Sequence, residues 1–144
     1  WKIGFVFQEY NLIGVLSAQE NVEYVLMLRG VPFRERRQRA RAILADVGLE
    51  GLETRLPNEL SGGQQQRVAV ARAIVSKPAI VLADEPTANL DSKTGAALLD
   101  MMRRLNDEQG VTFVFSTHDP MVMERARRVV HLKDGRIERE ERRP

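Results

Sequence analysis

The stretch from Leu60 to Ala73, LSGGQQQRVAVARA, begins with residues whose types and spacing suit the binding of an anion. Ser61 is placed to cap a helix, and Gln64, three residues later, is placed to complete a capping box. Gly62 and Gly63 have no Cβ, so a ligand can approach their backbone amides where the helix dipole presents partial positive charge. The same four residues also suit an ordinary capped helix without a ligand, and on their own they leave both interpretations open.

Other polar residues that could do chemistry stand at the ends of apolar runs. Asp84 and Glu85 follow Ala79–Ala83, a wholly apolar run that predicts a central parallel strand. Such a strand delivers both carboxylates to the carboxyl edge of the sheet, where ligands bind in open α/β folds. Gln8 ends the run IGFVFQ, and His118 follows VTFVFS. Taken singly, each of these residues has a simpler explanation as a polar group exposed to water at the end of a strand.

Taken together, the motifs resemble those of the ATP-binding cassette (ABC) ATPases. LSGGQ resembles the family's signature sequence, IVLADE its Walker B strand and ANLD its D-loop, while the glutamine of FVFQ and the histidine of FSTHD resemble the Q-loop glutamine and the switch histidine. The motifs stand in the family's order. The resemblance implies an α/β fold of the P-loop NTPase kind, with a mostly parallel sheet flanked by helices and a helical subdomain inserted into it.

The resemblance also divides the chain and assigns roles to its residues. It implies one partial ABC ATPase domain over residues 1–144, with a Q-loop strand at about 1–10, a helical subdomain at 11–60, and the signature helix, Walker B, D-loop, switch histidine and C-terminal hairpin at 61–144. The implied ligands are ATP and Mg²⁺. The implied catalytic residues are Glu85 as general base, His118 at the γ-phosphate and Gln8 at the magnesium and the attacking water, with Asp84 holding magnesium through water.

The remaining implied contacts lie between subunits. The signature would touch the nucleotide bound by a second ATPase subunit, and the D-loop would lie at the interface of a head-to-tail homodimer. The signature residues are Leu60, Ser61, Gly62, Gly63 and Gln64, and the D-loop residues are Asn89, Leu90 and Asp91.

One motif of the family does not occur in the sequence, because no G-x-x-x-x-G-K-[ST] is present to wrap the phosphates. The family keeps this loop N-terminal to the glutamine strand, so we expect it roughly 40 residues upstream of Trp1. We therefore interpret the chain as an N-terminally incomplete cassette. Its 144 residues alone are expected to be inactive, and a fragment that only docks onto other proteins is the alternative.

Composition and spacing narrow the functional class. The sequence is 43% hydrophobic and 29% charged, has a net charge of +2 and no cysteine, and contains no long apolar run. The short segment between FVFQ and LSGGQ excludes the long coiled coils of chromosome-structure ATPases. The strings SAQENVEYVLMLRG and STHDP resemble the subfamily that powers lipoprotein release and macrolide export. This resemblance implies an integral-membrane permease as partner, a cytoplasmic location on the inner face of the membrane, and no nucleic acid; a soluble, non-transport cassette is the alternative.

Local patterns predict the elements that position these residues. We expect a strand buried on both faces at Lys2–Gln8, helices from Ser17 to Gly30 and from Phe33 to Val47, and a solvated face for the arginines of the second helix. Further along, the patterns predict a helix from Ser92 to Gln109 capped by Asp91, a strand at Val111–Ser116, a short helix after Asp119, a hairpin about Asp134 and Gly135, and a frayed tail from Glu138. Ala88 stands where relatives carry glycine and would be strained if its φ were positive.

Overall fold

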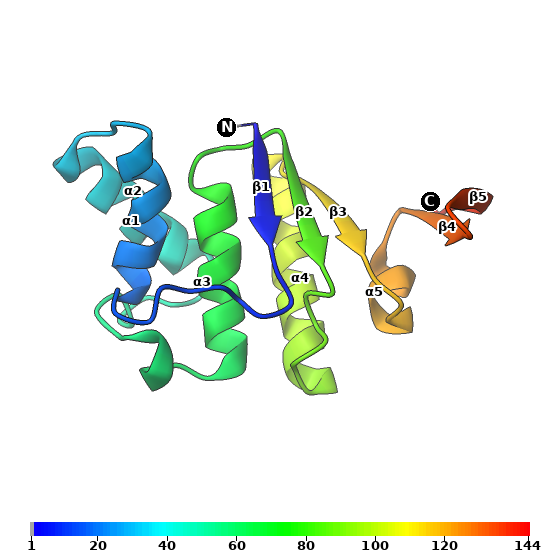
Figure 1. Ribbon diagram of the computed structural model, residues 1–144, viewed down its shortest axis with the longest axis horizontal. Helices are drawn as coiled ribbons and strands as arrows, with labels where there is room; N and C mark the ends of the chain where they lie inside the picture. The colour runs from blue at the N-terminus through cyan, green and yellow to red at the C-terminus, as the bar shows by residue number, and fades with distance from the viewer. Residues whose placement is uncertain (1) are drawn as a thin grey trace.

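The computed structural model describes residues 2–144, in which helices alternate with the strands of a parallel sheet (Figure 1). The elements follow in the order β1 (Ile3–Val6), α1 (Ala18–Leu28), α2 (Phe33–Asp46), a 3₁₀ turn (Pro57–Glu59), α3 (Gly62–Ile74), β2 (Ile80–Asp84), α4 (Ser92–Gln109), β3 (Thr112–Ser116), α5 (Pro120–Arg125), β4 (Arg128–Lys133) and β5 (Arg136–Arg142). The predicted elements are therefore present in the predicted order, with ends shifted by one to two residues.

The sheet places β2 between β1 and β3, with all three strands parallel. Ile3 pairs with Ile80, and Ile80 pairs with Thr112, so the strands are closely in register. The central position predicted for the apolar run after Pro78 is confirmed. Because the strands run in one direction, their carboxyl ends meet at the lower edge of the sheet in Figure 1.

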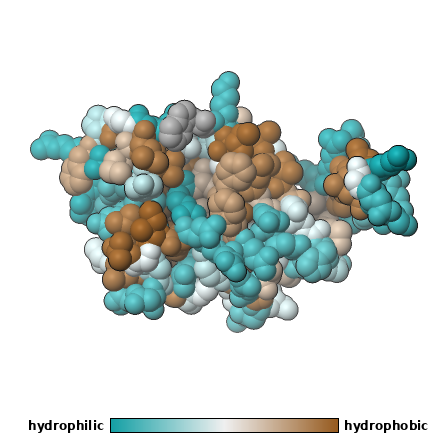
Figure 2. All heavy atoms as spheres, in the orientation of Figure 1, coloured by the Kyte–Doolittle hydropathy of each residue, from teal (hydrophilic) through white to brown (hydrophobic). Residues whose placement is uncertain are grey.

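Only one face of this sheet is covered by the described residues, so the expectation that β1 is buried on both faces is wrong. Gly4 and Val6 face the helices and are buried, whereas 54% of Ile3 and 49% of Phe5 are exposed. Side chains alternate between the two faces of a strand, and α3 and α4 both lie on the same face. Figure 2 shows the resulting hydrophobic surface over β1 and β2. The apolar run of β1 is typical of a strand with helices on both faces of its sheet. None of the described elements covers the second face.

The two helices between β1 and α3 form a small helical layer beside the sheet (Figure 1). Ser17 and Glu20 form a complete capping box at the start of α1. Val22 and Leu26 of α1 are fully buried in the core that continues through α2 and α3. The expected solvated face of α2 is confirmed for the exposed Arg34, Arg37 and Arg41, whereas Arg39 is half-buried and donates to the carbonyl of Val75 at 2.8 Å.

The C-terminal hairpin lies apart from the parallel sheet (Figure 1). Asp134 and Gly135 have φ values of 48° and 73°, as a two-residue hairpin turn requires, so the predicted hairpin is confirmed. The expected fraying is wrong as far as Arg142, because β5 pairs with β4 along its length and Glu140 forms an ion pair with Arg128 at 2.9 Å. Among residues 2–144, no helix has the length and apolar content needed to cross a bilayer.

Candidate functional site at the carboxyl edge of the sheet

The polar residues singled out in the sequence follow directly from the three neighbouring strands. Val6 pairs with Ala83, and Asp84 pairs with Ser116, which are the last pairs at this edge. Gln8, Glu85 and Thr117 therefore lie within the first two residues of the loops that leave one edge of the sheet. Gln8 and Asp84 are exposed. Position and exposure leave both free to meet a ligand at this edge.

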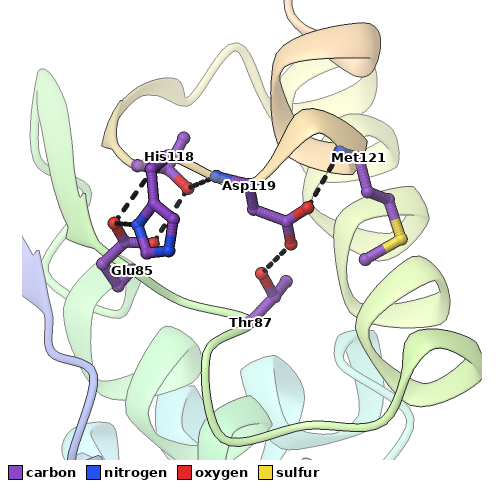
Figure 3. Close-up of polar contacts among 6 residues, drawn as sticks. Glu85, Thr87, His118, Asp119 and Met121 are labelled. Atoms are coloured by element: carbon purple, nitrogen blue, oxygen red, sulfur yellow. Dashed lines mark hydrogen bonds and ion pairs between the residues drawn. The ribbon is translucent and has the colours of Figure 1, made fainter.

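Glu85 is the most constrained residue of the edge. It lies just beyond β2 with a positive φ of 41°, and its backbone amide donates to the carbonyl of Ser116 at 2.9 Å. Its Oε1 lies 2.6 Å from Nδ1 of His118 and 3.1 Å from the His118 backbone nitrogen, and its Oε2 accepts from the Thr117 hydroxyl at 2.9 Å (Figure 3). A left-handed conformation at a non-glycine residue is uncommon and persists where surrounding contacts hold it.

These contacts set the charge of Glu85. Partial burial acts to raise its pKa, but hydrogen bonds from His118 and Thr117 outweigh burial and hold the pKa of Glu85 below its usual value. The carboxylate is therefore ionised at neutral pH and fixed in direction. His118 is 91% exposed, so the imidazole reaches away from the protein on the side that Glu85 faces.

A chain of polar contacts connects this pair to the loop after β2. The Thr117 hydroxyl accepts from the Asp119 amide at 3.0 Å, and Asp119 caps α5 by accepting from the Met121 amide at 2.9 Å (Figure 3). The other carboxylate oxygen of Asp119 accepts from the buried hydroxyl of Thr87 at 2.8 Å. The loops that follow β2 and β3 are thus joined by side-chain hydrogen bonds.

The start of α3 has the predicted cap. The Ser61 hydroxyl accepts from the Gln64 amide at 3.2 Å, and the Gln64 side chain accepts from the Ser61 amide at 2.9 Å. The amides of Gly62 and Gly63 lie in the first turn, where an α-helix provides no carbonyl acceptor. Anion binding by these amides therefore remains compatible with the geometry.

The reason proposed for the two glycines is incomplete, because both also contact other parts of the chain. A Cβ at Gly62 would lie 2.9 Å from the Tyr10 hydroxyl and 3.6 Å from Cδ2 of Leu90. A Cβ at Gly63 would meet the methyl group of Thr94. The missing side chains thus let the loop after β1 and the start of α4 approach α3, whether or not a ligand is bound.

Comparison with known proteins decides the family. The family model described as "ABC transporter" matches residues 1–88, which is more than half of the chain. The chain belongs to the ABC transporter family. The α/β fold expected from the resemblance is confirmed by solved cassettes with the same arrangement of sheet and helices.

Relatives of this cassette include proteins named for export and for lipoprotein release. The chain is 50% identical over 136 residues to the macrolide export ATP-binding/permease protein MacB of Campylobacter jejuni. The aligned residues make up 94% of this chain and 21% of that relative. It is 47% identical over 135 residues to the lipoprotein-releasing system ATP-binding protein LolD of Syntrophus aciditrophicus. The aligned residues make up 94% of this chain and 60% of that relative. The subfamily resemblance seen in the sequence is thereby confirmed.

A solved structure gives a similar result. A cassette of Methanocaldococcus jannaschii, captured as a dimer with ADP and Pi after hydrolysis, matches with a TM-score of 0.83 and 50% identity over 98% of this chain and 62% of that chain. The chain thus spans about three-fifths of the length of that cassette and of the LolD relative.

The predicted D-loop, residues 89–91, contacts the loop after β1 and the start of α3. Asn89 donates to the carbonyl of Gln8 at 3.0 Å, Leu90 approaches Gly62, and Asp91 caps α4 by accepting from the Thr94 amide at 3.0 Å. Ala88 is not among the residues with positive φ, so the alanine in place of glycine is not strained.

Sequence reasoning missed the residues that join these motifs to one another. Tyr10, Gln66, Arg72 and Thr87 make their contacts with residues at least 20 positions away in the chain. None of these side chains stands in a local pattern that points to a partner. The described residues also contain no cluster of three potential metal-ligating side chains, so a magnesium ion held by Asp84 would take most of its ligands from elsewhere.

Proposed function

We propose that this chain is part of the ATP-hydrolysing subunit of an ABC transporter that works as a head-to-tail dimer beneath a membrane permease. The observation that carries the proposal is the convergence of Gln8, Asp84, Glu85 and His118 at the carboxyl edge of the sheet, with Glu85 held as an oriented carboxylate. Names of relatives support the macrolide-export and lipoprotein-release type. The glycine and lysine loop is not among the 144 residues, so it would come from elsewhere in the full-length protein.

In this proposal Glu85 acts as general base. Magnesium-bound ATP supplies the phosphoryl group and its electrophilic phosphorus. Glu85 accepts a proton from the attacking water on its carboxylate, which its hydrogen bonds keep ionised and pointed toward His118. His118 contacts the γ-phosphate through its exposed ring, and Asp84 would hold the magnesium ion through water.

The signature acts in trans in this proposal. The exposed Ser61 and the first-turn amides of α3 present hydrogen-bond donors and the positive end of a helix to the nucleotide of the opposite subunit. The neighbouring D-loop residues Asn89 to Asp91 would form part of the same interface. The dimeric state of a related solved cassette supports this arrangement.

An exposed apolar surface at the helical layer supports a permease as partner. Val15, in the loop between β1 and α1, is 84% exposed, and Tyr24, Met27 and Leu28 of α1 are also exposed. Figure 2 shows hydrophobic side chains gathered where this loop reaches α1. Contact there would act on the same loop that carries Gln8, so the permease would be coupled to the catalytic edge and the subunit would lie on the cytoplasmic face of the membrane.

The substitution Glu85→Gln tests the proposal in the full-length protein. Glutamine keeps the shape of the side chain but accepts no proton, so we expect ATP turnover to fall by about 10²-fold or more while ATP binding is retained. Turnover is measured by phosphate release and binding by calorimetry. Glu50→Gln is the matched control, because the Glu50 carboxylate is exposed and lies far along the chain from the edge residues. Turnover by Glu85→Gln at the rate of the control would remove Glu85 as the base.

A further inference from the structure

The loop after β1 is held by side chains that reach it from other elements. Carbonyl groups of four of its residues accept such hydrogen bonds: Phe7 from Gln66 at 3.4 Å, Gln8 from Asn89 at 3.0 Å, Tyr10 from Arg72 at 2.9 Å and Asn11 from Arg72 at 2.6 Å. Backbone carbonyls in a surface loop commonly bond to water instead. The path of this loop is therefore set by the elements behind it.

Two of these carbonyls belong to residues in an unfavourable backbone conformation. Tyr10 and Asn11 have φ values of 31° and 50°, so two consecutive residues with side chains lie in the left-handed region. Such conformations persist only where the surroundings hold them. Arg72 donates to both carbonyls, so it contacts the loop at the strained residues themselves.

Within residues 2–144, the side chain of Arg72 binds backbone carbonyls rather than a carboxylate. No carboxylate of residues 2–144 forms an ion pair with it, and its guanidinium is partly buried, so that burial lowers the pKa of Arg72. The cost of placing a cation there is offset by two charge-assisted hydrogen bonds to the loop. The planar fork of arginine can donate to two neighbouring carbonyls at once, which the single ammonium of lysine does less well.

The same loop also contacts the opposite end of α3. The Tyr10 hydroxyl lies against Gly62 at the first turn of the helix, while Arg72 stands in its last turn. Between them, the buried Gln66 donates to the carbonyls of Phe7 and Pro86. The loop thus contacts α3 at three levels, by hydrogen bonds from Gln66 and Arg72 and by the close approach of Tyr10 to Gly62.

We propose that Arg72 is a positioning residue of the ATPase site: it fastens the Gln8 loop to the signature helix, so that Gln8 and the signature move together. The proposal rests on the proposed function for its catalytic consequence. The fastening itself is a property of the fold and can be measured without ATP.

The first experiment measures hydrogen exchange in the full-length protein with Arg72→Lys, beside the matched control Arg67→Lys. Arg67 lies on the same helix and donates to the carbonyl of Val47, away from the loop. We expect exchange at the amides of residues 10–12 to rise by about tenfold or more in Arg72→Lys and to stay within about twofold of wild type in Arg67→Lys. Equal exchange in the two variants would overturn the proposal.

The second experiment compares ATP turnover of the same proteins. Arg72→Lys is expected to lower kcat by about tenfold with KM for ATP within about threefold of wild type, because a displaced Gln8 affects the reaction more than the binding. Raised loop exchange with unchanged kcat would overturn the catalytic part of the proposal. If the wild-type protein hydrolyses no ATP, the proposed function is wrong. The hydrogen-exchange result still shows whether Arg72 holds the Gln8 loop against α3. Should Arg72→Lys not fold by circular dichroism, Arg72→Gln takes its place in both experiments.

Discussion

At the residue scale, the orientation of the Glu85 carboxylate is determined by residues that lie far from it in the sequence. The adjacent carboxylates Asp84 and Glu85 are recognisable from their place after an apolar run. The difference between them comes from the loop after β3, because His118 and Thr117 form hydrogen bonds with the Glu85 carboxylate. Asp84 is left exposed. The pair of candidates was thus predictable, but the orientation of the Glu85 carboxylate was not.

The lowered pKa of Glu85 predicts a pH dependence of stability. A carboxyl whose pKa is lower in the folded state stabilises the fold above its ordinary value of 4.5, and this contribution is lost as pH falls below that value. Wild type should therefore be more stable than Glu85→Gln near neutral pH, and the difference should shrink in acid. Chemical denaturation over a pH series measures it. A difference that grows in acid would show that the hydrogen bonds to His118 and Thr117 do not stabilise the ionised form.

At the scale of elements, local signals explain most of what could be predicted. The caps at Ser61 and Asp91 lie where the sequence predicts them, because a cap depends on residues only two to three positions apart. The burial of a strand depends on what covers it, which a local pattern does not contain. For this reason the position of β1 was predicted correctly and its exposed face was not.

The packing of β1 on α3 predicts a large difference between two glycine substitutions. A Cβ at Gly4 would lie 2.5 Å from the carbonyl oxygen of Ala73, whereas a Cβ at Gly14 would meet nothing within 4 Å. Gly4→Ala should therefore lower the free energy of unfolding by about 1–3 kcal/mol, because backbone must move to admit the methyl group. Gly14→Ala is the control and should change it little. Thermal or urea unfolding measures both, and equal effects would contradict this account of the contact.

At the scale of the whole molecule, the sequence and structure together predict that nucleotide binding needs more than these residues. The 144 residues contain no glycine and lysine loop for the phosphates. Titration of this chain with magnesium and ATP should give no measurable binding heat. A chimera that adds the matching N-terminal part of the LolD relative should bind. Tight binding by the chain alone would mean that another group in it performs the work of the missing lysine.

The order of strands in the sheet has a consequence for how the chain is made. In the described residues β1 pairs only with β2, where Ile3 meets Ile80, so β1 leaves the ribosome long before its partner exists. At synthesis rates of about 5–20 residues per second, the ribosome needs roughly 4–15 s to pass from Ile3 to Ile80, so β1 waits that long for β2. The helices between the two strands have nearby partners and can form during this delay. The pairing of β1 with β2 therefore comes after the stage at which the helical layer is already able to fold.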